Sequence, residues 1–144
     1  MITVTSQLDH APNDVFDVVS DLSSYTSWQS GLERIEVVSG DGATVGSRFK
    51  AKLTQGALSI EVEGSLVERR GDEFLRYRMD HDDASIEVSI EVVAAGGGGT
   101  RLTQNIALEI RSFVLKLARK QIESKLEEKA RADVEGLRRV LAAS

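Results

Sequence analysis

The sequence has no cysteine, a single proline and few aromatic residues among its 144 positions. The lack of cysteine excludes disulfides, thiol catalysis and thiolate metal sites. Because aromatic residues make up only 5% of the chain, its core must consist mainly of Val, Leu, Ile and Ala. The chain is long enough to bury such a core without crosslinks, and we expect a single domain over residues 1–144.

A long apolar run and an excess of positive charge are also missing. No uninterrupted apolar segment approaches the roughly 20 residues that a membrane-spanning helix needs. The start of the chain, Met1–Thr5, has neither the basic segment nor the apolar core of a signal peptide. We therefore expect a cytoplasmic protein without an integral membrane segment. The net charge of −5 argues against broad nucleic-acid binding, which needs a basic face.

The pattern of apolar residues changes period along the chain. Ile2–Leu8 alternates between apolar and polar residues, as a strand does. Pro12 favours the first turn of a helix, and a second short helical segment is expected at Ser23–Ser27. From residue 35 to residue 108 a period of two returns in successive short segments. Such alternation is typical of antiparallel strands with one covered and one exposed face.

The last segment, from about Ser112 to Ala142, has a helical period. Its apolar residues recur every three or four positions, which defines one apolar stripe: Leu115, Ala118, Ile122, Leu126, Ala130, Val134, Leu137 and Leu141. About 30 residues of helix span roughly 45 Å, enough to cross the whole domain. One helix covers a broad sheet only if the twisted sheet curves around it. The expected fold class is therefore α+β: a curved antiparallel sheet of about seven strands wrapped around a long C-terminal helix, with two short helices after the first strand.

A sheet wrapped around a helix leaves a space between the two layers, and such clefts are common ligand sites. The alternative is a fully packed core with no cavity, and the periodicity alone does not decide between them. The phase of each strand and helix nominates the cavity-facing residues: Phe49, Leu53, Ile60, Tyr77, Met79, Ile86, Val88, Gln104, Ile106, Leu115, Ala118, Ile122 and Leu126. Trp28 is a further candidate, either as a wall of the pocket mouth or as an ordinary core residue. Only Tyr77 and Gln104 bring strand polar groups inward. A buried amide such as that of Gln104 needs a partner, which a ligand, a water or another side chain would supply.

Other polar motifs do not form a convincing reactive site. His81, Asp82 and Asp83 fall between two predicted strands and are interpreted as an exposed hairpin turn, without the spacing of a zinc site. The glycines at 96–99 lead into a strand rather than a helix, so they are not expected to bind phosphate. We therefore expect no catalytic residue, no metal and no cofactor.

Three stretches resemble a known family: Ala11–Leu22, Tyr25–Trp28 with Gly31–Glu33, and Gly40–Phe49. Together with the terminal helix, they resemble the START-related superfamily with the helix-grip fold, and within it the bacterial polyketide cyclase/dehydrase and lipid-transport family. The resemblance covers essentially the whole chain. It implies a domain that binds lipids, polyketides or related molecules, because most such relatives bind ligands and a minority are enzymes.

Three functions remain open at this point. The first is a non-catalytic carrier or sensor of an apolar small molecule, lipid or polyketide-like. The second is an aromatase/cyclase-type enzyme, which would need a positioned acid or base in the pocket. The third is a regulatory or toxin-like interaction protein. The sequence does not decide between a monomer and a dimer.

Overall fold

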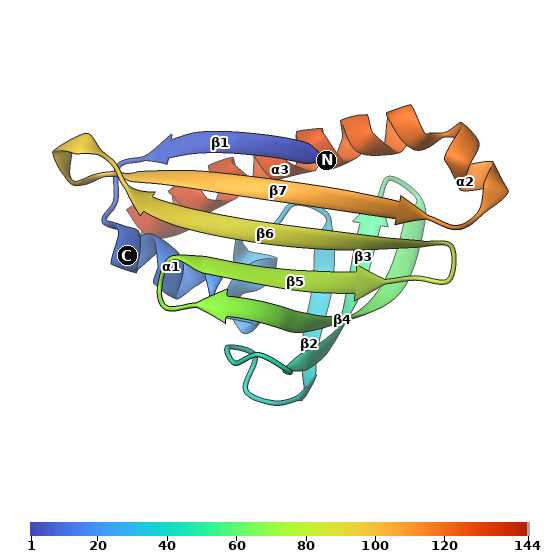
Figure 1. Cartoon of the computed structure of the whole chain (residues 1–144), viewed down its shortest axis with the longest axis horizontal. Coiled ribbons are helices and arrows are strands. Elements are labelled where there is room, and N and C mark those ends of the chain that lie inside the picture. Colours follow the sequence, from blue (N-terminus) through green and yellow to red (C-terminus); the bar gives the residue numbers. More distant parts are fainter. Residues whose placement is uncertain (144) are drawn as a thin grey trace.

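The computed structural model describes residues 1–143, and every side chain among them except that of Gln55. Seven strands form one sheet, accompanied by a long helix and several short ones (Figure 1). The elements in chain order are β1 (Ile2–Leu8), α1 (Pro12–Val19), the 3₁₀ helix η1 (Leu22–Ser27), β2 (Leu32–Ser39), β3 (Arg48–Gln55), β4 (Leu58–Arg70), β5 (Phe74–Asp80), β6 (Ala84–Ala94), the 3₁₀ helix η2 (Gly96–Gly98), β7 (Thr100–Ile110), α2 (Phe113–Leu117) and α3 (Arg119–Ala142).

The sheet is antiparallel throughout, in the order β1-β7-β6-β5-β4-β3-β2. Hairpins join consecutive strands from β2 to β7, whereas β1 pairs with the last strand. Figure 1 shows β5, β6 and β7 running along the long axis of the molecule while β2 and β3 are turned across it. This change of direction is the strong curvature that the sequence predicted. The α+β helix-grip fold is confirmed.

Both predicted short helices are present after β1. Pro12 occupies the first turn of α1, which buries Val15, Phe16 and Val19. Asp21 caps η1, because its carboxylate accepts a hydrogen bond from the backbone N–H of Ser23 at 3.0 Å. These helices close one end of the space under the sheet.

The C-terminal helical segment is not continuous, in contrast to the prediction of one helix from about Ser112. It breaks at Ala118, where φ is −99° and ψ is 13°, and this break separates α2 from α3. The Ala118 N–H donates to the carbonyl of Leu115 at 3.0 Å, an i→i−3 bond that tightens the turn. Apolar periodicity continues through the break, so the sequence pattern did not reveal it.

The two ends of the apolar stripe differ in packing. The buried residues of α3 all lie in its second half and are Ala130, Asp133, Val134, Gly136, Leu137 and Leu141. From Phe113 to Lys129, by contrast, no residue is buried. A Cβ at Gly136 would lie 2.8 Å from the carbonyl carbon of Trp28 and closer still to its oxygen. Only glycine lets α3 approach the backbone after η1 this closely.

Candidate ligand site

A cavity of about 70 Å³ lies between α3 and the concave face of the sheet. It is mostly apolar, and nine of the predicted residues line it: Trp28, Leu53, Tyr77, Met79, Ile86, Val88, Gln104, Ile106 and Leu126. The strand phases that placed the seven strand residues among them inward were therefore correct. That they bind a ligand stays a prediction. The sequence did not nominate five further lining residues: Gln29, Ile90, Lys129, Ala130 and Asp133.

The remaining five predicted residues lie outside this lining. Phe49 is buried behind it, with its ring edge-to-face on Tyr77 at 6.3 Å between centroids. Three others are only partly covered: Leu115 on α2, Ala118 at the break, and Ile122 in the first turn of α3.

Ile60 departs most from its expected placement. It was expected to face inward, but it is 46% exposed. Ile60 pairs with Leu53 near the tip of the β3–β4 hairpin, and β4 is exposed at each position from Leu58 to Glu61. Alternation places Ile60 on the inner face, yet the hairpin extends beyond what α3 covers.

An aromatic cluster forms the wall near η1. The Tyr25 ring makes edge-to-face contacts with Trp28 at 4.8 Å and with Tyr77 at 5.8 Å. The Tyr25 hydroxyl donates to the carbonyl of Val19 at 2.5 Å. This wall is fixed by ring packing and by a hydrogen bond to α1, so it gives the cavity a rigid side.

Two buried polar atoms of the lining residues have no hydrogen-bond partner within residues 1–143: the indole Nε1 of Trp28 and the amide Oε1 of Gln104. Buried polar groups are normally paired, so each unpaired atom calls for an explanation. A ligand carrying a hydrogen-bond acceptor would suit Trp28, and one carrying a donor would suit Gln104.

A polar network crosses the cavity wall between α3 and the loop after η1. Asp133 accepts hydrogen bonds from the backbone N–H of Ser30 at 2.6 Å and from Lys129 at 2.7 Å. The same ammonium group donates to Gln29 Oε1 at 3.3 Å, and Gln29 Nε2 donates to the Tyr77 hydroxyl at 3.3 Å. Four side chains from three parts of the chain are thereby coupled.

Burial sets the protonation behaviour of this network. Loss of water raises the pKa of Asp133, while Lys129 and the Ser30 N–H oppose that rise. Burial also raises the pKa of Tyr77, so its hydroxyl stays protonated. Asp133 lies three residues after Ala130 and four before Leu137, both in the apolar stripe. If the apolar stripe is widened to include all positions three or four residues from its members, Asp133 falls among buried neighbours.

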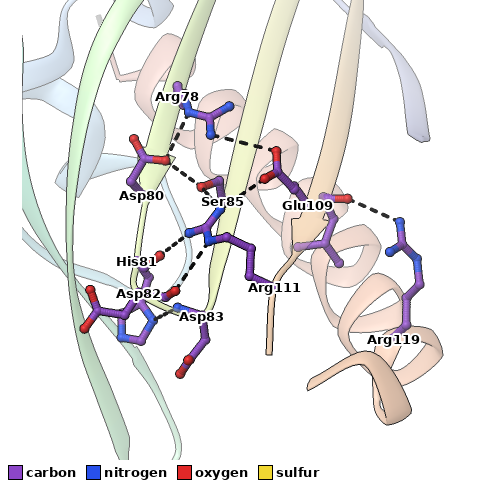
Figure 2. Close-up of polar contacts among 10 residues, drawn as sticks. Arg78, Asp80, His81, Asp82, Asp83, Ser85, Glu109, Arg111 and Arg119 are labelled. Carbon is purple, nitrogen blue, oxygen red and sulfur yellow. Dashed lines mark hydrogen bonds and ion pairs between the residues drawn. The ribbon is translucent and has the colours of Figure 1, made fainter. Parts of the chain in front are cut away.

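The predicted turn at His81–Asp83 is a turn, with Asp82 and Asp83 exposed. Figure 2 shows that Arg111 anchors it: this side chain donates to the carbonyls of His81 and Asp82 and to Ser85 Oγ, the last at 2.8 Å. Across residues 1–143, no three His, Asp or Glu side chains are grouped so as to hold a metal ion. Arg111 thus ties the turn to the end of β7.

A larger hollow, of about 540 Å³, lies on the sheet beside β2, β3, β4 and the end of β5. Its lining is dominated by charged side chains of both signs, and Arg34 pairs with Glu61 across it at 3.0 Å. Such an open, internally paired surface has little to select an apolar molecule. In the part of the chain described, no helix combines the length and apolar character needed to cross a membrane.

Comparisons with known proteins agree with this fold. The family model of polyketide cyclase/dehydrase and lipid transport matches residues 1–142. A protein of Thermus thermophilus, TTHA0849, is similar in structure, with a TM-score of 0.82, 18% identity, and coverage of 99% of this chain and 97% of that one. The Zhui aromatase/cyclase of Streptomyces sp. R1128 gives a TM-score of 0.80 at 12% identity, covering 98% and 92%.

A third similar structure is norcoclaurine synthase of Thalictrum flavum in complex with dopamine and hydroxybenzaldehyde. Its TM-score is 0.74 at 14% identity, and the match covers 99% of this chain and 86% of that one. No curated protein matches the sequence closely enough to count as a relative. At these identities the solved structures establish the fold alone, whereas the family model matches almost the whole sequence. The chain therefore belongs to the polyketide cyclase/dehydrase and lipid transport family, and it has the helix-grip fold.

Proposed function

We propose that this domain binds an apolar small molecule, lipid or polyketide-like, between the first half of α3 and the sheet, and that it carries or senses this molecule without transforming it. The observation that carries the proposal is the absence of any buried residue from Phe113 to Lys129. Opposite this segment, the apolar side chains of Leu53, Met79 and Ile86 are themselves only partly covered. An apolar ligand would complete this layer.

The size of the cavity constrains how a ligand enters. Ligand pockets usually measure about 300–1,000 Å³, whereas this one is about 70 Å³. A lipid-sized molecule therefore requires the first half of α3, after Arg119, to move away from the sheet. The sparse packing of this segment favours such opening, since weakly buried elements open at low free-energy cost.

The direct test is ligand binding with a cavity-filling variant. Native mass spectrometry and thermal shift are measured with fatty acids and aromatic polyketide-like compounds. Ile86→Phe should fill the cavity and weaken binding by roughly tenfold or more, because it removes the space a ligand occupies. Ser89→Phe places the same ring on the other face of β6 and should leave binding unchanged.

Hydrogen exchange gives an independent readout of the same site. A bound ligand should slow amide exchange between residues 113 and 129 and change it little between 130 and 141. Finding no bound compound from the panel, or binding that Ile86→Phe leaves intact, would contradict the proposal.

The second candidate function is a cyclase-type enzyme, and the network of Tyr77, Gln29, Lys129 and Asp133 favours it. A buried carboxylate with a raised pKa beside a cavity is a common feature of acid/base sites. The Tyr77 hydroxyl accepts from Gln29 and keeps its own proton for another acceptor. Turnover of a polyketide-like substrate that disappears in both Asp133→Asn and Tyr77→Phe would replace the carrier proposal with this one.

A further inference from the structure

α2 displays three large apolar side chains to solvent. Phe113 is 74% exposed, Val114 72% and Leu117 73%. Only Leu115 of this helix turns partly inward. Clustering of three such side chains on five residues of helix is costly in water unless another surface covers them.

The charge around these residues is strongly biased. The segment from Arg111 to Lys120 contains four basic residues and no acidic one, although the whole chain has a net charge of −5. Neither Lys116 nor Lys120 takes part in an ion pair among residues 1–143. Exposed apolar side chains flanked by unpaired lysines match the chemistry of an anionic lipid surface, where acyl chains lie beneath negatively charged headgroups.

α2 is also held in place from both sides, so its exposure is not that of a loose end. On one side, Arg111 bonds to the β5–β6 turn through Ser85 and the carbonyl of Asp82. On the other, Arg119 donates to the carbonyl of Leu108 on β7 at 3.2 Å. Figure 2 shows Arg111 directed toward the β5–β6 turn and Arg119 directed toward β7. The fold therefore presents Phe113, Val114 and Leu117 outward.

From these observations we propose that α2 docks this domain on an anionic bilayer: Phe113, Val114 and Leu117 enter the headgroup region while Lys116 and Lys120 contact the lipid phosphates. The docked helix would belong to the least packed part of the helical segment, residues 113–129. The lipid surface would thus meet the domain where the proposed ligand enters. Docking adds to the proposed function without depending on it, since it requires no bound ligand.

Charge argues against a second copy of the chain as the occupant. A symmetric dimer through α2 would place the same patch of both copies face to face. Arg111 and Arg119 pair with Glu109 and Glu123 within each copy, so Lys116 and Lys120 of one copy would face the same unpaired lysines of the other. Like charges at such an interface disfavour association.

Vesicle flotation tests the proposal with the full chain. Wild-type protein should bind vesicles of phosphatidylcholine and phosphatidylglycerol in equal parts, and not vesicles of phosphatidylcholine alone. Because part of the attraction is between exposed charges, binding should weaken as salt is raised. Replacing Phe113, Val114 and Leu117 together by serine should lower the partition coefficient by roughly tenfold or more. Lys116→Gln and Lys120→Gln should each lower it by about fivefold.

Matched controls distinguish binding through α2 from nonspecific binding by other exposed apolar residues. Val38→Ser with Val45→Ser removes exposed apolar groups elsewhere, at 48% and 57% exposure, and should leave vesicle binding unchanged. Brominated lipid in anionic vesicles should quench the fluorescence of the tryptophan introduced by Phe113→Trp. It should not quench that of the tryptophan introduced by Val45→Trp. All the replaced side chains are exposed, so circular dichroism should report an intact fold.

Three results would overturn the proposal. The first is no binding of the wild type to anionic vesicles at low salt. The second is binding that the triple serine variant retains. The third is self-association in sedimentation velocity that this variant abolishes while no vesicle binds, which would assign α2 to a second copy.

Discussion

The two halves of the C-terminal helical segment share one apolar stripe and yet pack very differently. Between Ala130 and Leu141 six residues of α3 are buried, and between Phe113 and Lys129 none is. The difference comes from what stands opposite each half. The second half meets β1, α1 and the backbone at Trp28, whereas the first half lies across the cavity from the partly covered side chains of Leu53, Met79 and Ile86. One regular apolar stripe thus has two parts. Residues 130–141, the closed end, are packed and stabilise the fold, whereas residues 113–129 are less covered and are available for binding.

Truncating the same residue type in each half should expose the largest difference. Leu137 is completely buried, so Leu137→Ala should lower the free energy of unfolding by about 3–4 kcal/mol. Leu126→Ala, on the partly covered half, should cost about 1 kcal/mol, since less apolar area returns to water. Urea unfolding followed by the fluorescence of Trp28 measures both. Equal losses in the two variants would remove the distinction between the ends.

Gly136→Ala should have the next largest effect and the opposite sign from helix propensity. Alanine is about 1 kcal/mol better than glycine inside an exposed helix, yet a Cβ here collides with the carbonyl of Trp28. We expect a net loss of about 2–3 kcal/mol in unfolding free energy, because α3 must separate from η1. Gly96→Ala, whose new methyl meets no atom within 4 Å, is the control and should change stability little. A Gly136→Ala variant that is more stable than the wild type would show that α3 and the backbone at Trp28 move apart without loss of stability.

The fold could be predicted from the sequence because apolar residues recur along the chain with the period of each strand and helix. A period of two in the strands and of three to four in the helix placed eight cavity-lining residues correctly. What escaped depends on three-dimensional context. Ile60 has the right phase but lies beyond the cover of α3, and the break at Ala118 interrupts the backbone while leaving the apolar spacing intact.

The polar network of Lys129 and Asp133 also could not be predicted, because its burial depends on residues distant in the sequence. Lys129 and Asp133 are four residues apart on a helix rich in charge, where most such pairs are exposed and contribute little. Nothing local distinguishes this pair from Arg131 with Glu127, which pair at 3.6 Å on the exposed face. Only the approach of the loop after η1, which brings in Ser30 and Gln29, buries one pair and leaves the other in water.

Gln104→Leu probes the cavity between the two ends and should have a smaller effect. The amide Oε1 is buried without a partner among the described residues, so its removal should stabilise the empty domain by about 1 kcal/mol. The same variant should bind a hydroxyl-bearing ligand more weakly and a pure hydrocarbon equally well. Thermal unfolding and native mass spectrometry measure the two effects. A destabilised variant would show that the Gln104 amide contributes to the stability of the empty fold.

Asp133→Asn should give the smallest change and one that depends on pH. Burial raises the pKa of Asp133 in the folded state, so the folded protein binds a proton more readily than the unfolded chain, whose Asp pKa is about 3.9. The contribution of this group to stability is therefore fully present at low pH and is lost as pH rises through the raised folded pKa. Asn cannot titrate, so the variant should match the wild type near pH 4 and become more stable than it by about 1 kcal/mol or less toward pH 7. Urea unfolding across this pH range tests the sign. A variant that instead loses stability as pH rises would mean that the Lys129–Asp133 ion pair outweighs the cost of burying its charge, and that the packed half of the helical segment begins at Lys129 rather than at Ala130.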